Sequence, residues 1–235
     1  MLDVKNLTKR YGNSTAVDNL NFKLENGTVS ILLGPNGAGK STVMKTIAGL
    51  LRFEGSIRID DIENHLPASH RIMGYIPEIP SFYPNLTVAE HMEFIARAYR
   101  LKNYKQRADD LLKRFELYDK RKKFGDELSK GMQQKLNICL GLLTEPRLIL
   151  LDEPFIGLDP HAIKELRNVV KEKKDDGCTI LISTHIIDSV DTLWDRTIIM
   201  KKGQICADIN REEFERTNGS LEQLFFELTE GDSAT

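Results

Sequence analysis

The chain has 235 residues, of which 40% are hydrophobic and 29% are charged, and its formal net charge is −2 at pH 7. This length suits one large domain or a domain with a subdomain, and the composition supports a sizeable core and excludes a disordered chain. The charge gives no reason to expect a nucleic-acid partner, and three widely spaced cysteines favour a reduced, cytosolic chain without a cysteine metal site. No apolar run reaches the length of a membrane span, so a membrane role would need a partner.

The first third of the chain predicts strands around one helix. Residues 20–24 alternate between polar and apolar side chains before the turn signal Asn26-Gly27. Residues 29–33 form a short apolar run that is typical of a buried strand. A glycine-rich loop and a helix at residues 41–48 follow. Further strands are predicted at residues 56–59 and 72–76.

The middle of the chain changes character after Pro77. Amphipathic patterns predict helices at residues 88–99, 106–117 and 129–143. Buried strands are then predicted at residues 148–151 and 179–183, and a hairpin joins residues 196–200 to 205–209 through Lys202-Gly203. We therefore expect one domain. Residues 1–76 and 144–230 would form an α/β core with a β-subdomain, residues 77–143 an inserted helical subdomain, and residues 231–235 a frayed tail.

The first motif that carries chemistry lies between the predicted strand at 29–33 and the helix at 41–48. Residues 34–41, Gly-Pro-Asn-Gly-Ala-Gly-Lys-Ser, match the pattern G-x-x-x-x-G-K-[ST]. Glycines let successive backbone amides turn toward phosphate oxygens, and the helix N-terminus favours the same anion. The Lys40 side chain can reach the β- and γ-phosphates of a nucleotide, and the Ser41 hydroxyl can bind magnesium.

A second motif ends the apolar run at residues 148–151 with two carboxylates. Asp152 is placed to hold magnesium, directly or through water. Glu153 is then the natural group to orient and polarise an attacking water. Acids at the end of a strand often only begin a loop, but beside a phosphate-binding loop the catalytic interpretation is favoured.

A third motif, Leu128-Ser129-Lys130-Gly131-Met132, opens the predicted helix at residues 129–143. Ser129 is a good N-cap, and Gly131 leaves backbone amides open. By itself this segment is a capped helix. It is also a second helix N-terminus that can bind an anion.

Together with Gly157-Leu158-Asp159 and Ser183-Thr184-His185, these motifs occur in the order found in the ATP-binding subunits of ABC transporters, and the chain resembles that family from Leu2 to about Leu228. The resemblance implies a P-loop NTPase core of the ABC type with an antiparallel β-subdomain and an inserted α-helical subdomain. It implies ATP and Mg²⁺ as cofactors.

The resemblance also implies residue roles. Tyr11 matches the aromatic residue that stacks on adenine, and Val17 matches an apolar contact beside it. His185 matches the histidine that contacts the γ-phosphate and orients Glu153. Asp159 matches the residue that links two sites across a dimer. The expected nucleotide-binding residues are Tyr11, Val17, Asn36, Gly37, Ala38, Gly39, Lys40, Ser41, Thr42, Glu78, Ser129, Gly131 and Asp159; the expected catalytic residues are Lys40, Glu153 and His185; and the expected metal ligands are Ser41, Glu78 and Asp152.

Two departures from the family pattern concern the third motif and the segment after residue 76. Glu78 stands where the family usually has glutamine, and an ionised carboxylate can only accept hydrogen bonds. Lys130 and Met132 stand where glycine and glutamine are common. Both variants resemble the branch that drives exporters of the ABC-2 type.

The resemblance implies a motor subunit at the cytoplasmic face of the cell membrane, bound there through transmembrane permease subunits. A second copy, or a paralogous ATP-binding subunit, would close on two ATP molecules, and no nucleic-acid partner is expected. Two alternatives stay open: an ABC-type ATPase acting on DNA repair or ribosomes, and a nucleotide-binding regulator with little turnover. The cargo, the direction of transport and the choice between homodimer and heterodimer are not encoded in these motifs.

Overall fold

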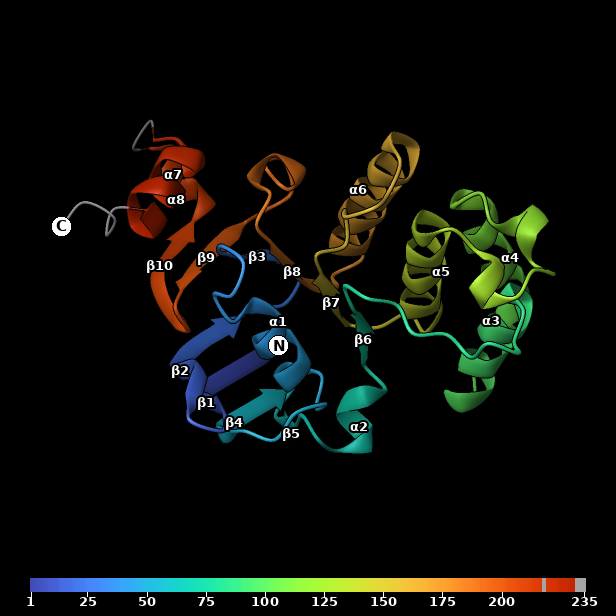
Figure 1. Ribbon diagram of the computed structural model, residues 1–235, viewed down its shortest axis with the longest axis horizontal. Coiled ribbons are helices and arrows are strands. Elements are labelled where there is room, and N and C mark those ends of the chain that lie inside the picture. Colours follow the sequence, from blue (N-terminus) through green and yellow to red (C-terminus); the bar gives the residue numbers. More distant parts are fainter. Residues whose placement is uncertain (217–218, 231–235) are drawn as a thin grey trace.

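The computed structural model of the chain describes residues 1–216 and 219–230, and it contains two β-sheets flanked by helices (Figure 1). The smaller sheet is antiparallel, with strand order β2-β1-β4-β5. Its strands are β1 (Leu2–Tyr11), β2 (Ser14–Leu24), β4 (Glu54–Ile59) and β5 (Ile62–Glu63). In β4 the exposed Arg58 lies between the buried Ile57 and Ile59, so this sheet buries one face and leaves the other to solvent.

The larger sheet has the order β10-β9-β3-β8-β7-β6. Its strands are β3 (Val29–Leu33), β6 (Met73–Ile76), β7 (Leu148–Asp152), β8 (Thr179–Thr184), β9 (Arg196–Lys201) and β10 (Gln204–Asn210). The pairs from β9 to β6 are parallel, and β10 adds an antiparallel edge. Every residue of β3, β7 and β8 is buried, because helices or the smaller sheet cover both faces.

Alternate residues of the buried strands supply two hydrophobic cores. Leu148 and Leu150 face the core shared with the smaller sheet and with α1 (Lys40–Ile47). Ile149 and Leu151 face the core shared with the helices on the other side. Those helices are α3 (Val88–Ala98), α4 (Tyr104–Arg114), α5 (Lys130–Leu143), α6 (Pro160–Asp175) and α8 (Leu221–Glu230). Two short helices, α2 (Pro67–His70) and α7 (Arg211–Glu215), complete the set in the described residues.

The predicted strands and helices are confirmed with changed boundaries, except for one helix that is misplaced by several residues. The helix predicted at residues 106–117 is α4, which begins at Tyr104 and ends at Arg114. Glu116 takes a positive φ of 58°, and the Leu117 N–H then donates to the Leu112 carbonyl. Leu117 therefore packs in the core although it lies outside α4. The apolar pattern of the sequence continues past the end of the helix for this reason.

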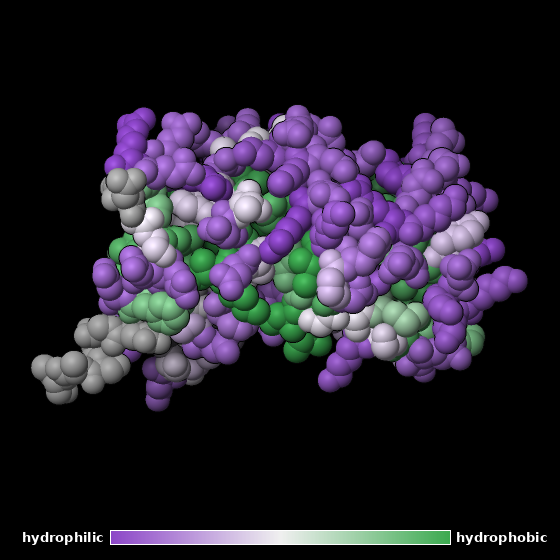
Figure 2. Space-filling view, turned by 90° about the horizontal axis from the view of Figure 1, so that it is seen from above, coloured by the Kyte–Doolittle hydropathy of each residue, from purple (hydrophilic) through white to green (hydrophobic). Residues whose placement is uncertain are grey.

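Helices α6 and α8 were not predicted, and the predicted frayed tail at residues 231–235 lies outside the described residues. None of the helices in the described residues is long and apolar enough to cross a membrane. The face of the molecule in Figure 2 is covered mainly by hydrophilic side chains.

The parallel strands bring the sequence motifs together at one edge of the larger sheet. Leu33, at the end of β3, pairs with Thr184, and Asp152, at the end of β7, pairs with Ser183. Ile76, at the end of β6, pairs with Leu151. The loops that follow β3, β6, β7 and β8 therefore leave the sheet side by side, and the crevice outside the carboxyl ends of such strands is where open α/β sheets bind ligands.

Candidate functional site

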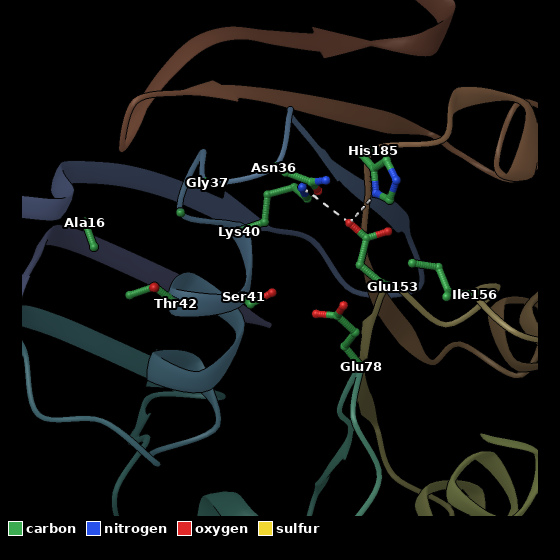
Figure 3. Close-up of a pocket in the computed structure, with 11 residues that line it drawn as sticks. Ala16, Asn36, Gly37, Lys40, Ser41, Thr42, Glu78, Glu153, Ile156 and His185 are labelled. Carbon is green, nitrogen blue, oxygen red and sulfur yellow. Dashed lines mark hydrogen bonds and ion pairs between the residues drawn. The ribbon is translucent and has the colours of Figure 1, made fainter. Parts of the chain in front are cut away.

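A cavity of about 370 Å³ lies at this edge of the sheet. Its lining residues come from β2, the loop before α1, α1 itself and the segments after β6, β7 and β8: Ala16, Asn36, Gly37, Gly39, Lys40, Ser41, Thr42, Glu78, Glu153, Ile156 and His185 (Figure 3). Nine of these residues were predicted as site residues from the sequence; Ala16 and Ile156 were not.

The glycine-rich loop is held tightly against its surroundings. Gly39, at the N-cap of α1, has φ of 103°, and a Cβ atom there would lie 2.6 Å from the Ala16 carbonyl oxygen. Ala38 is buried, and its carbonyl accepts a hydrogen bond from the Gly203 N–H. Helix α1 starts without a side-chain cap. Its first amides are thus available to an anion in the cavity.

Lys40 is the buried cation of the cavity, with 5% of its side chain exposed. Its ammonium donates to the Gly34 carbonyl at 2.7 Å and lies 3.3 Å from Glu153 Oε1. Burial of a charge requires such partners. The ammonium therefore lies between the loop that precedes α1 and the carboxylate that follows β7.

Asp152 is fully buried beneath the cavity and is surrounded by hydroxyl groups. Its Oδ1 accepts hydrogen bonds from Ser41 Oγ at 3.0 Å and from Ser183 Oγ, and its Oδ2 accepts one from the Tyr75 hydroxyl at 3.4 Å. Burial, followed by the charge of Asp152 and the hydrogen bond to it, raises the pKa of Tyr75 above its usual range. Tyr75 therefore stays a neutral donor to this carboxylate.

Glu153 projects its carboxylate into the cavity from an unusual backbone conformation. Its φ is 46°, in the left-handed region that residues with a side chain rarely adopt. The Glu153 N–H donates to the Ser183 carbonyl, which holds the turn. Oε1 lies 3.0 Å from His185 Nδ1, and Oε2 is buried without a hydrogen-bond partner (Figure 3). Such an orphaned buried oxygen is suited to accept a bond from a ligand or a water.

The oxygen donors in and beside the cavity fit a hard divalent cation. Ser41 and the buried Asp152 carboxylate are in direct contact, and the Glu78 carboxylate points into the same cavity from the segment after β6 (Figure 3). Carboxylate and hydroxyl oxygens are the ligands that Mg²⁺ prefers. The predicted metal ligands thus lie together.

Tyr11 and Val17, the two residues expected to contact the adenine, do not line the cavity. Tyr11 lies at the exposed end of β1, and the Lys9 ammonium is 5.0 Å from its ring centroid. Val17 has no exposed surface. Its neighbour Ala16 forms the apolar wall of the cavity instead, because alternate residues of β2 point to opposite faces.

Ser129, Gly131 and Asp159 also lie away from the cavity lining. Ser129 caps α5, its Oγ accepting from the Met132 N–H at 3.3 Å. A Cβ atom on Gly131 would lie 2.7 Å from the Gly157 carbonyl oxygen, so α5 packs directly on the loop that leads to Asp159. The hydrogen bond from Lys135, and then that from the Ala162 N–H, lowers the pKa of Asp159. Ser129 and Gly131 thus lie at the start of α5, and Asp159 lies at the start of α6 and is tied to α5 through Lys135.

Sequence reasoning gave no role to Tyr75 and Ser183, although both belong to segments that were singled out. Ser183 pairs with Asp152 in the sheet, Tyr75 lies one residue before the end of β6, and each donates to Asp152. The signal was present as a hydroxyl group at the end of a buried strand. Only the parallel register of β6, β7 and β8 places those hydroxyls on one carboxylate.

Comparisons with known proteins place the whole chain beside one family. A family model described as "ABC transporter" matches residues 17–156. The chain is 38% identical over 244 residues to the "ABC-type transporter ATP-binding protein EcsA" of Bacillus subtilis (strain 168), with 99% of this chain and 98% of that protein covered. It is 35% identical over 218 residues to the "SkfA peptide export ATP-binding protein SkfE" of the same organism, covering 92% and 91%.

Solved structures give the same result. A structure described as the ATP-binding subunit of an ABC transporter superposes with a TM-score of 0.91 at 36% identity and covers 97% of this chain and 99% of that one. A dimeric, post-hydrolysis ATP-binding cassette bound to ADP and Pi gives a TM-score of 0.81 at 29% identity, covering 89% and 98%.

Proposed function

The chain belongs to the ABC transporter family, and from that premise we propose that it is the ATP-hydrolysing subunit that powers a separate membrane permease through the residues of the cavity. The observation that carries this proposal is the contact of Lys40, Glu153 and His185 in one cavity, directly above the Ser41–Asp152 pair. This cavity combines an uncapped helix start, a buried ammonium and a carboxylate with an unpartnered oxygen.

Nucleotide binding is assigned to the loop of residues 34–41. The open amides at the start of α1 and the Lys40 ammonium would contact the β- and γ-phosphates of ATP. Asn36, Gly37, Gly39 and Thr42 line the same cavity and would surround the phosphates, and the buried Ala38 fixes the loop behind them. Tyr11 would reach the adenine from the exposed end of β1, with Ala16 rather than Val17 beside it.

Glu153 is assigned as the general base. A water beside its carboxylate would attack the γ-phosphorus and transfer a proton to Glu153, while the bond from that phosphorus to the bridging oxygen of ADP breaks. His185 Nδ1, 3.0 Å from Oε1, would orient the carboxylate. The products are ADP and inorganic phosphate.

Mg²⁺ would be held by the Ser41 hydroxyl, Asp152 and the Glu78 carboxylate, which lines the same cavity as Ser41. When bound, the ion neutralises charge on the β- and γ-phosphates. Ser183 and Tyr75 hold Asp152 in place for this role.

The residues at the starts of α5 and α6 would serve a second subunit. Ser129, Gly131 and Asp159 do not line this chain's own cavity, so we assign Ser129 and Gly131 to the γ-phosphate of an ATP on a second copy or a paralogous subunit, and Asp159 to the link between the two sites across the dimer. Closure on two ATP molecules, and reopening after hydrolysis, would then be the motion delivered to the permease.

The class of transported substrate and the direction of transport are inferred from the names of similar proteins. A relative is named for peptide export, and on that basis we propose an exporter of the ABC-2 type. The chain would be bound to the cytoplasmic face of the membrane through its permease. Residues 77–143 would form the helical subdomain that contacts the permease near residues 77–86, and the rest of residues 1–230 would form the core and the β-subdomain.

The direct test is Glu153→Gln. This change keeps the shape and the hydrogen-bonding reach of the side chain but removes the base, so steady-state ATPase activity should fall about 10²- to 10⁴-fold. ATP-dependent dimerisation, measured by size-exclusion chromatography with light scattering, should persist.

The matched control is Glu145→Gln, which changes an exposed carboxylate paired with Arg107 outside the cavity. It should keep wild-type turnover. Wild-type turnover in Glu153→Gln would remove Glu153 as the base, and absence of ATP binding by the wild-type chain would overturn the proposed function.

A further inference from the structure

Two buried amide side chains lie on the face of α5 that packs against the sheet. Gln134 is 3% exposed and Asn137 is 8% exposed, and they are three residues apart on one face of the helix. Neither has a role in the chemistry described above. Buried amides are costly unless they are hydrogen-bonded, so the partners of these two define what they do.

Both amides donate to carbonyls of loops that carry a cavity carboxylate. Asn137 Nδ2 donates to the Pro77 carbonyl at 2.8 Å, and Pro77 is followed by Glu78. Gln134 Nε2 donates to the Pro154 carbonyl at 3.4 Å, and Pro154 is preceded by Glu153. A third bond, from Asn137 Nδ2 to Gln134 Oε1 at 3.4 Å, joins the two amides.

The chemistry of the partners fixes which way each amide points. Proline has no N–H, so its backbone offers only a carbonyl acceptor. The nitrogen of each side-chain amide must therefore face its proline, and the two hydrogens of Asn137 Nδ2 serve both of its bonds. The result is one continuous link from the Pro77 carbonyl through Asn137 and Gln134 to the Pro154 carbonyl.

The hydrogen bond from Asn137 to the Pro77 carbonyl oxygen also constrains the residue that follows Pro77. The Pro77 carbonyl and the Glu78 N–H belong to the same planar peptide unit, so a fixed carbonyl also fixes the direction in which the chain enters Glu78. Asn137 also lines a second cavity of about 210 Å³, together with Tyr75 and Ser81 from the segments before and after Pro77. Because this space leaves the segment incompletely packed, the hydrogen bond from Asn137 is the contact that holds the Pro77 peptide.

The same helix begins at Ser129 and packs on the Gly157 loop through Gly131. A shift or rotation of α5 would consequently act on both loops through two buried bonds. We propose that Asn137 is a positioning residue for Glu78, and that Gln134 extends the link to the loop of Glu153. The inference rests on the proposed function, because it concerns the geometry of the same cavity.

The test is a double-mutant cycle between Asn137 and Glu78. Asn137→Leu keeps the shape of the side chain and removes the donor. In the otherwise wild-type chain, kcat of the Mg²⁺-ATPase should fall about tenfold and the Mg²⁺ concentration for half-maximal rate should rise, while the Kd for ATP measured without metal stays within about twofold. In a Glu78→Gln background the same Asn137→Leu change should alter kcat less than about twofold, because the group that Asn137 positions has already been altered.

The matched control is Gln133→Leu. Gln133 lies on the same helix and donates through Nε2 to the Gly125 carbonyl at 3.1 Å, but that loop carries no residue of the cavity. Its effect on kcat should be the same with Glu78 and with Gln at position 78. Asn137→Ala provides a second variant if the leucine fails to fold.

Equal losses from Asn137→Leu in the two backgrounds would overturn the inference, as would unchanged kcat in both or a Gln133→Leu effect that also depends on Glu78. Those results would leave the proposed function standing, since the wild-type chain would still bind and hydrolyse ATP. If the wild-type chain bound no ATP, the proposed function itself would fail.

Discussion

The N-termini of α1 and α5, which carry the two glycine-containing motifs, make an instructive comparison. Both are preceded or opened by glycine and carry a lysine at the first helical position, Lys40 and Lys130. Helix α1 begins without a side-chain cap, and Lys40 is buried against Glu153. Helix α5 is capped by Ser129, and its Lys130 is exposed.

A glycine-containing motif at a helix N-terminus therefore occurs in two different settings in this chain. The α1 start is enclosed by loops of its own chain and opens into a cavity lined by residues of this chain. The α5 start is fixed to the Gly157 loop and lies outside the cavity lining, and its proposed ligand is the ATP of a second subunit. Predictions at the two helix starts should therefore differ in kind: loss of binding at α1, and loss of assembly at α5.

The largest effect is expected at α1. Lys40→Ala removes the buried ammonium that would contact the phosphates and leaves Glu153 facing its site without that cation, so ATPase activity should fall at least about 10²- to 10³-fold. ATP binding, measured by calorimetry, should weaken together with turnover. The control is Lys45→Ala, which changes an exposed side chain in the last turn of the same helix. This variant should behave as wild type. Equal kinetics in the two variants would show that α1 is not the primary phosphate site.

An intermediate effect is expected at α5. Gly131→Ala places a Cβ atom 2.7 Å from the Gly157 carbonyl oxygen, so α5 and that loop must separate. Strain of this kind costs about 1–3 kcal/mol, which is roughly 5- to 150-fold in an equilibrium. ATP-dependent dimerisation and turnover should fall by that factor, while ATP binding to the isolated chain stays near wild type.

Lys130→Ala tests whether nearby charge, rather than the Gly131 contact, produces the loss. Its side chain is exposed at the preceding position, and its effect on dimerisation should be smaller than that of Gly131→Ala. Weakened ATP binding by the isolated Gly131→Ala chain would contradict the division of roles between α1 and α5.

The smallest effect is expected at Lys135, which ties α5 to Asp159 at 2.7 Å and to Glu116 at 3.1 Å. Lys135→Met keeps the apolar stem and removes both ion pairs. Exposed carboxylates make each pair worth about 0.2–1 kcal/mol after screening by water, so the midpoint of thermal unfolding should fall by roughly 2–4 °C near neutral pH.

The pH dependence of this difference has a defined sign. The hydrogen bond from Lys135 is the main cause of the lowered pKa of Asp159, whose usual value is 3.8. The stabilisation is therefore present above that value and is lost as the pH falls through the lowered pKa. The wild-type and Lys135→Met unfolding midpoints should converge in acid; a gap that widens there would assign the effect to another group.

Local patterns in the sequence were sufficient for most of the secondary structure. Buried strands such as β3 and β7 are short apolar runs bounded by turn residues, and their pattern specifies them without reference to the rest of the chain. Helix α6 carries a comparable signal. Asp159 caps it, Pro160 opens it, and Leu166, Val169 and Val170 form its buried stripe among charged residues.

The sequence by itself determined the chemistry of the phosphate loop and of the carboxylate pair, because both depend on residue types at fixed spacing along the chain. Which groups meet across long separations was decided by the tertiary structure. Ser183 reaches Asp152 through the register of β7 and β8, and Asn137 reaches Pro77 across 60 residues through the packing of α5. Periodicity specifies which face of an element is buried, but only the packing of that face against a distant segment decides which carbonyl or carboxylate lies opposite.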